Sequence, residues 1–318
     1  MKNKSMKNKY APIILFTYRR LDTLKLTISS LLKNRISKNS KIFIFSDGYK
    51  NSEDKLDVQK VREYLKDLKS FKKKKLYFRK KNFGLAKNIT QGVTEILRKE
   101  KVGIILEDDV IVSRNFLSYM NLCLKKYENE KRIWHINAWN YNLNDKKNKD
   151  TNEIFLWRGM HCWGWATWQD RWKFYEKNIN NIYSSFSKDK KYKFNYDGTY
   201  DFWQQVDRNY SKKINTWAIF WYAKIFIKKG LCLSPKFSLS QNIGNDRYAT
   251  NMMFNNYNIK PVKYRFDKKW KFFFPKKIIE NKKLFNQIKK YLLKKKLLDK
   301  FKSILNFDFL FTLFKIKK

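Results

Sequence analysis

The chain has 318 residues, of which 43% are hydrophobic and 18% aromatic, so it can form one large domain or two modest ones with a sizeable core. Its net charge of +44 favours polyanionic partners such as nucleic acid, anionic lipid headgroups or phosphorylated substrates. Three cysteines without metal-ligand spacing argue against a disulfide framework and suit a reducing cytosol. Because no stretch reaches the roughly 20 apolar residues of a membrane span, we expect a soluble or surface-attached protein.

The first 112 residues alternate between strand and helix patterns. Apolar runs predict strands at 11–17, 41–46, 75–79 and 102–106, and apolar residues at helical spacing predict helices at 21–31, 58–68 and 85–97. Such alternation indicates a parallel sheet with right-handed crossovers. No G-x-G-x-x-G motif follows the first strand, which argues against a dinucleotide site of the Rossmann type.

Three consecutive acids, Glu107, Asp108 and Asp109, follow the fourth predicted strand directly. They therefore fall at the carboxyl end of a buried strand, where open α/β sheets bind their ligands. Adjacent carboxylates repel one another and are tolerable if they are solvated or if a hard divalent cation sits among them. The sequence predicts a metal–nucleotide site here, and the alternative is a solvated acidic loop.

The other three strands also end in polar residues. Thr17 and Arg19 follow the first strand, Asp47 the second and Asn82 the third. In a doubly wound sheet these ends line one crevice, where Arg19 suits a phosphate and Asp47 and Asn82 suit a base or ribose. The alternative is that Asp47 belongs to a plain turn and Arg19 is a surface charge.

The second half predicts a helix over 116–127, a strand over 133–137, a polar loop over 142–152 and a helix over 217–227. Between them, residues 157–172 contain five tryptophans. Tryptophan faces stack on sugar rings or bases, so this stretch predicts an acceptor surface, and the alternative is a tryptophan-rich core. From Lys263 onward, lysine clusters alternate with Phe, Leu and Ile, which suits an anionic membrane surface or, alternatively, an ordinary packed helix.

An ordered set of motifs resembles bacterial nucleotide-sugar glycosyltransferases of the GT-A fold and, more distantly, N-acetylglucosaminyltransferase I. The set is Thr-Tyr-Arg, Ser-Asp-Gly, Asn-Phe-Gly-Leu-Ala, Leu-Glu-Asp-Asp-Val and Trp-Gly-Trp-Ala-Thr-Trp, between about Pro12 and about Tyr248. The resemblance implies that Asp109 ligates Mn²⁺ or Mg²⁺ and that Glu107 and Asp108 lie near the ribose and sugar. It also implies that Arg19, Asp47 and Asn82 face the nucleotide.

The resemblance departs at Ala218. The eukaryotic relatives, and some bacterial ones, carry an Asp after the tryptophan that corresponds to Trp217, and it looks like their catalytic base. An inverting transferase needs such a group to take the proton of the acceptor hydroxyl. The nearby carboxylates in sequence are Asp246 and Asp201, which we take as the candidates, and Asp207.

We therefore expect an α/β protein with a GT-A-type, Rossmann-like, mostly parallel sheet flanked by helices, a Trp-rich acceptor half and a basic helical tail. Residues 1–112 would bind the nucleotide sugar, 113–260 the acceptor, and 261–318 would form the basic amphipathic segment. The expected activity is metal-dependent transfer from a nucleoside-diphosphate sugar, chiefly a UDP-sugar, to a glycan or lipid-linked glycan of cell-surface polysaccharide or lipopolysaccharide. We expect a cytoplasmic enzyme at the inner face of an anionic membrane, with no nucleic-acid partner. The alternatives are an inactive sugar-nucleotide-binding homologue and a basic nucleic-acid-binding protein.

Overall fold

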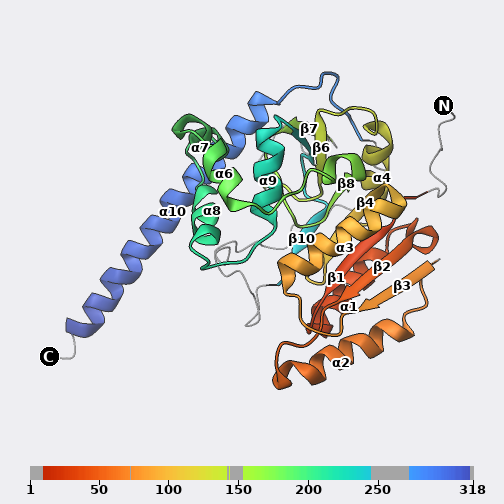
Figure 1. Ribbon diagram of the computed structural model, residues 1–318. Helices are drawn as coiled ribbons and strands as arrows, with labels where there is room; N and C mark the ends of the chain where they lie inside the picture. Colours follow the sequence, from red (N-terminus) through yellow and green to blue (C-terminus); the bar gives the residue numbers. More distant parts are fainter. Residues whose placement is uncertain (1–9, 72, 142, 144–152, 245–271, 316–318) are drawn as a thin grey trace.

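The computed structural model, shown in Figure 1, describes residues 10–71, 73–141, 143, 153–244 and 272–315, with side chains in the last helix described to residue 301. Most of the predicted polar loop at 142–152 and the segment that contains Asp246 lie outside these residues. The strands are β1 (Ile13–Thr17), β2 (Lys41–Ser46), β3 (Lys73–Phe78), β4 (Val102–Glu107), β5 (Val110–Val112), β6 (Ile133–Asn137), β7 (Ile154–Trp157), β8 (Trp165–Trp168), β9 (Leu231–Pro235) and β10 (Ser240–Asn242).

The α-helices fall into two groups along the chain. The first half contains α1 (Leu21–Leu32), α2 (Ser52–Asp67), α3 (Leu85–Glu100) and α4 (Phe116–Lys126), with a short 3₁₀ turn, η1 (Ser37–Asn39). The second half contains α5 (Gln169–Trp172), α6 (Ile179–Ser185), α7 (Lys188–Phe194), α8 (Trp203–Tyr210), α9 (Ala218–Ile227) and α10 (Lys282–Lys315).

One eight-stranded sheet organises the molecule, in the order β3-β2-β1-β4-β8-β6-β9-β7. The strands β3, β2, β1 and β4 are parallel, so their carboxyl ends meet at one edge. β8 runs antiparallel to both β4 and β6, β9 runs parallel to β6, and β7 runs antiparallel to β9. A separate two-stranded ribbon pairs β5 with β10, which places the chain after β10 beside the end of β4.

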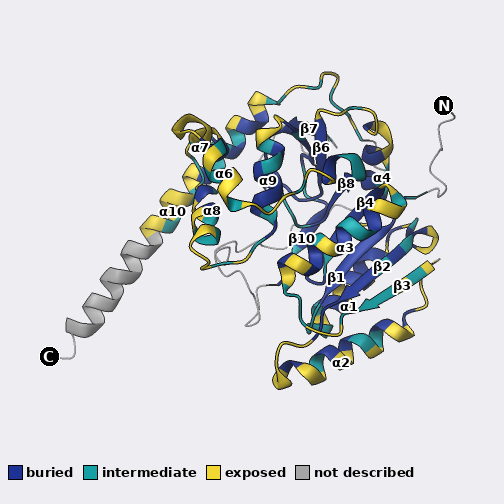
Figure 2. Ribbon diagram, viewed as in Figure 1, coloured by how far each residue is buried: buried dark blue, intermediate teal, exposed yellow. Residues whose placement is uncertain are grey.

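Both faces of the sheet are covered, as expected for continuous apolar strands. Alternate residues of β1 enter different cores: Ile13 and Leu15 belong to the core that includes residues of α1, α2 and α4, whereas Ile14 and Phe16 belong to the core that includes residues of α3, α9 and α10. Figure 2 shows the buried strands between helices whose outer faces are exposed.

The prediction of a mostly parallel α/β sheet flanked by helices is confirmed, and the four predicted β-α units agree with β1 to β4. Besides β5, β9 and β10, the strands that were not predicted from the sequence include β7 and β8. β7 and β8 are each four residues long and fully buried, so neither shows the alternation of apolar and polar residues that marks a half-buried strand.

The beginning of α10 is a packed helix. Its side chains Leu284, Phe285, Ile288 and Leu292 are at most 5% exposed and belong to the main core. Beyond them the helix extends away from the body in Figure 1, and Phe301 is 62% exposed. The packed-helix alternative therefore describes α10 up to Leu292, and the membrane prediction concerns the residues beyond Leu292. Among the described residues, no helix is both long and apolar enough to span a bilayer.

Candidate functional site

The three acids lie where β4 ends, at the edge shared with the carboxyl ends of β1, β2 and β3. Arg20 bridges two of them: its Nη2 atom lies 2.9 Å from Asp108 Oδ1 and 2.8 Å from Asp109 Oδ2. The backbone N–H of Tyr18 donates to Asp108 Oδ2 at 3.0 Å. A guanidinium thus partly neutralises the acids, and this contact was not predicted from the sequence. The second arginine of the Tyr-Arg-Arg sequence, which is Arg20, was the feature that could have indicated it.

Burial and mutual repulsion govern the charge of the acids. Burial, followed by the charges of Asp109 and Asp108, raises the pKa of Glu107 to about 8. Burial also raises the pKa of Asp108, although the Arg20 charge opposes the shift. Burial and mutual repulsion therefore oppose ionisation of these acids, and a further cation would relieve the repulsion.

The carboxylate oxygens of the cluster fit a divalent cation that takes most of its ligands from outside the cluster. Asp109 Oδ1 is buried and accepts no hydrogen bond from any residue that the structure describes, so within this part of the chain it is an oxygen without a partner. No group of three or more His, Cys, Asp or Glu side chains within the described part of the chain could form a metal centre. Divalent cations such as Mg²⁺ are often held by one or two carboxylates together with substrate phosphates, and this donor set matches that pattern.

The chain after β10 closes against the acids. The N–H of Ile243 donates to the Asp109 carbonyl at 2.8 Å. At Gly244, a Cβ atom would lie 2.1 Å from Asp109 Oδ2 and 2.7 Å from Arg20 Nη1. Only glycine fits this approach. Gly244 is the last described residue before the segment that contains Asp246.

The remaining predicted nucleotide residues lie at the neighbouring strand ends. Thr17 is buried beside the Asp108 carboxylate. Arg19 pairs with Asp54, which also accepts the Tyr18 hydroxyl. These contacts anchor the loop after β1 to the first turn of α2.

Asp47 and Asn82 hold the loops that follow β2 and β3. Asp47 Oδ1 accepts the N–H of Phe83 at 2.8 Å, and Oδ2 accepts the N–H of Gly84 at 2.9 Å. Burial raises the Asp47 pKa, and these backbone bonds oppose the shift. Asn82 Nδ2 donates to the Gly48 carbonyl at 2.7 Å. Both side chains have a structural role, and they lie at the edge predicted for the nucleotide.

The loop that connects β7 to β8 reaches the acids from the second half. The charges of Glu107 and Asp109 contribute, after burial, to a raised pKa of Cys162, so this thiol lies near the cluster. The next residue, Trp163, is partly buried, and its carbonyl accepts the Ser240 hydroxyl at 2.5 Å. The structure thus brings the two halves together at the acids.

Tertiary packing shows that four of the five clustered tryptophans are core residues. Trp157, Trp165, Trp168 and Trp172 are at most 3% exposed. The prediction that this stretch forms a sugar-stacking surface is wrong for these rings, because their faces are covered by other side chains. Of the five tryptophans within residues 157–172, only Trp163 is partly accessible.

The structure describes the surroundings of Asp201, one of the two candidate bases, and of Ala218. Asp201 is exposed before α8, where Oδ1 accepts the Gln204 N–H and the Asn195 amide, both at 3.1 Å. Ala218 begins α9, directly after Trp217, whose ring stacks on Trp165 at 5.2 Å. Asp246 lies outside the described residues.

Many solved structures match the chain at a distance, and the chain spans about half or less of each of the following three. They are mannosyltransferase PcManGT from Pyrobaculum calidifontis with GDP-Man and Mn²⁺ (10% identity, 53% of this chain, 49% of that chain, TM-score 0.33), GalNAc-T7 with UDP, GalNAc and Mn²⁺ (13%, 74%, 44%, 0.44), and S. aureus TarS (13%, 46%, 24%, 0.32). No curated protein sequence matches the chain.

A family model gives the assignment. The model of the GNT-I family matches residues 1–183, more than half of the chain and the part that carries β1 to β4 and the acids. This match confirms the resemblance to N-acetylglucosaminyltransferase I that the ordered motifs indicated. The chain belongs to the GNT-I family.

Proposed function

We propose that this protein is a metal-dependent glycosyltransferase that moves a sugar from a nucleoside-diphosphate donor, chiefly a UDP-sugar, to a glycan acceptor. The observation that carries the proposal is the unpartnered, buried Asp109 Oδ1 within an acidic cluster at the carboxyl ends of the parallel strands. Family membership supports the same activity. PcManGT and GalNAc-T7, whose structures contain Mn²⁺ with a nucleotide or nucleotide sugar, are consistent with it.

Asp109 would hold Mn²⁺ or Mg²⁺. When bound, such a cation supplies neutralisation of the diphosphate leaving group. Thr17, Arg19, Asp47 and Asn82 would line the nucleotide side of the site. Their present contacts keep the loops after β1, β2 and β3 in fixed positions, so the donor meets a preformed surface.

Glu107 and Asp108 would lie nearest the ribose and the transferred sugar. Asp108 is held by Arg20 and by the Tyr18 N–H, so its carboxylate has a fixed orientation. Glu107 ends β4, is partly exposed, and forms no hydrogen bond with its side chain within the described residues. Because burial raises its pKa to about 8, the Glu107 carboxyl is protonated at neutral pH and can donate a hydrogen bond to a sugar oxygen.

Calorimetry with UDP, with and without Mn²⁺, tests the site. The wild-type protein should bind UDP more tightly with Mn²⁺, and Asp109→Ala should lose that increment because the cation loses its protein ligand. Asp170→Ala is a matched control, since Asp170 is an acid paired with Lys131 and Arg171 away from the cluster. Metal-dependent binding that survives unchanged in Asp109→Ala would refute the assignment.

Either Asp246 or Asp201 would accept the acceptor proton in place of the carboxylate that Ala218 lacks. Gly244 lies against Asp109, which favours Asp246, two positions later. Asp246→Asn or Asp201→Asn should lower kcat by roughly 10²–10⁴-fold while leaving donor affinity unchanged. Near wild-type kcat in both variants would point to Asp207 or to another group.

Ala218 also favours a second candidate function, a sugar-nucleotide-binding homologue without transferase activity. A screen of donor hydrolysis across nucleotide sugars with Mn²⁺ separates the two. Donor binding without turnover of any donor would support the inactive homologue, whereas hydrolysis of one donor would support the enzyme.

The acceptor would be a lipid-linked or membrane-bound glycan of cell-surface polysaccharide or lipopolysaccharide, met at the inner face of an anionic membrane. Beyond Leu292, α10 exposes Leu293, Leu297, Leu298 and Phe301 among lysines. Exposed apolar side chains flanked by lysines suit an anionic lipid surface. Truncation after Leu292 should reduce co-sedimentation with anionic vesicles and leave UDP binding intact, and unchanged co-sedimentation would contradict the membrane role.

A further inference from the structure

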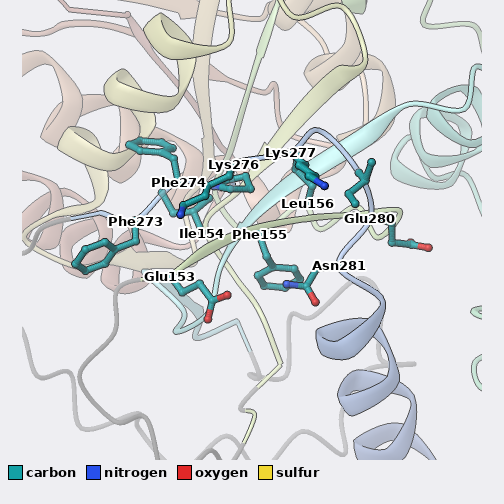
Figure 3. Close-up of a pocket in the computed structure, with 12 residues that line it drawn as sticks. Glu153, Ile154, Phe155, Leu156, Phe273, Phe274, Lys276, Lys277, Glu280 and Asn281 are labelled. Carbon is teal, nitrogen blue, oxygen red and sulfur yellow. The ribbon is translucent and has the colours of Figure 1, made fainter.

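A cavity of about 670 Å³ lies at the far edge of the sheet, away from the acids. One side is the edge strand β7, and the other is the segment 273–281, which leads into α10 (Figure 3). We call this segment the arch. Both ends of the arch are bonded to β7: the Ile154 N–H donates to the Phe273 carbonyl, and the Asn281 N–H donates to the Leu156 carbonyl, both at 2.8 Å.

The sequence of the arch explains why a cavity is left between these two bonds. Phe273 forms a parallel bridge with Glu153, and the next bonding position of a parallel ladder would be Pro275. Proline has no N–H to donate to the Ile154 carbonyl, so the ladder stops there. As a result, the Leu156 N–H and the Ile154 carbonyl point outward from β7 and find no partner within the described residues.

The charges around the cavity are unequal. Two carboxylates line it, but Glu280 is paired with Arg158 at 2.6 Å, and Glu153 lies 3.7 Å from the Lys236 ammonium. The lining lysines Lys276 and Lys277 are exposed and form no ion pair with the described residues. The unbalanced charge is therefore positive.

The rim is also apolar. Phe273 and Ile279 are 56% and 62% exposed, an unusual use of large apolar side chains on either side of two lysines. Positive charge and exposed apolar side chains together fit an anion that carries a hydrocarbon chain. Neither a neutral sugar nor a free phosphate ion would use both features.

The position of the cavity suits a lipid-linked acceptor. β7 lies four strand spacings from β4 in the sheet order, which is about 19 Å at the usual spacing. β9 has the direction of β4, and β7 runs antiparallel to β9. The Ile154 end of β7 therefore lies on the same side of the sheet as the carboxyl end of β4, where the acids are. An oligosaccharide could span that distance along one edge.

We propose that the cavity between β7 and the arch binds the phosphate-bearing lipid end of the acceptor, with Lys276 and Lys277 on the phosphate and Phe273 and Ile279 on the hydrocarbon chain. The role as an acceptor site rests on the proposed transferase function. The binding of a lipid phosphate can be measured independently of that function.

Calorimetry with octyl phosphate, kept below its critical micelle concentration, tests the proposal on the full-length protein. The wild type should bind it, and Lys276→Gln with Lys277→Gln should weaken binding by roughly tenfold or more, since two charge-assisted contacts are lost. Ile279→Ser should weaken the binding of octyl phosphate while leaving the weak binding of inorganic phosphate unchanged. Lys282→Gln with Lys283→Gln is the matched control, because these exposed lysines follow the arch and do not line the cavity, and it should bind like the wild type.

Three results would overturn the proposal: equal binding of octyl phosphate by the wild type and the Lys276/Lys277 variant, binding of octyl glucoside as tight as that of octyl phosphate, or competition between octyl phosphate and UDP with Mn²⁺. The last result would place the probe at the acids. Binding of octyl phosphate by a protein that does not bind UDP would refute the proposed transferase function and leave the lipid-phosphate site standing.

Discussion

Replacing Arg20 tests whether the acid cluster depends on its internal counter-charge. The Arg20 side chain is 18% exposed, and those of Asp108 and Asp109 are 5% and 11% exposed, so this is a largely buried ion triad. Removing one partner from a buried pair costs about 3–5 kcal/mol, because the remaining charges stay desolvated. Since Arg20 keeps some contact with solvent, we expect Arg20→Met to lower the free energy of unfolding by about 3 kcal/mol, the lower end of that range.

Urea denaturation followed by tryptophan fluorescence measures this loss. Arg132→Met is the control: Arg132 also pairs with a glutamate, Glu130, but is 62% exposed, so solvent already screens the pair and the loss should be much smaller. Mn²⁺ should restore more stability to Arg20→Met than to the wild type, because the cation replaces the missing positive charge. If Arg20→Met is no less stable than Arg132→Met, the guanidinium does not hold the cluster together.

Three further predictions concern the site and the tail. Because the Glu107 pKa is raised from 4.5 to about 8, the folded state binds this proton more tightly than the unfolded state, and the free energy of unfolding should fall as pH rises from about 4.5 to 8. Urea titrations of Glu107→Gln should show a smaller fall. An identical pH profile in the variant and the wild type would contradict the shift. Gly244→Ala should weaken UDP binding in the presence of Mn²⁺, since its Cβ would displace the Asp109 carboxylate, and unchanged calorimetry would argue against the close approach. A chain that ends at Leu292 should have the same free energy of unfolding as the full chain. A chain that ends at Asn281 should lose several kcal/mol of that free energy, because four buried apolar side chains of α10 are removed. Equal urea midpoints for the two truncations would show that the helix is not part of the core.

Local sequence patterns were enough to predict the first half of the fold. The predicted strands and helices up to residue 112 agree with β1 to β4 and α1 to α3, because each follows from apolar spacing within a short window. The position of the acids after β4 was predicted for the same reason. A continuous apolar run that ends in three carboxylates fixes both a buried strand and the edge at which its polar residues emerge.

The contacts that make the acids a site join residues far apart in the chain. Arg20 meets Asp108 and Asp109 across 88 and 89 positions, and no local pattern distinguishes it from Arg19, which pairs with Asp54 instead. The approach of Gly244 depends on the pairing of β10 with β5. Only the tertiary structure decides which of two adjacent arginines neutralises the cluster.

Burial likewise separates side chains that look alike in the sequence. Trp157, Trp165 and Trp168 lie in short strands of the sheet and are fully buried, whereas Trp163 lies in the loop between them and is partly accessible. In the lysine-rich tail, Phe285 packs into the core and Phe301 is exposed, although both occur among lysines. Composition determined that the chain is rich in aromatic residues and strongly basic. Which aromatic rings stay accessible depended on strand pairing and helix packing, because both place residues distant in sequence against the same surface.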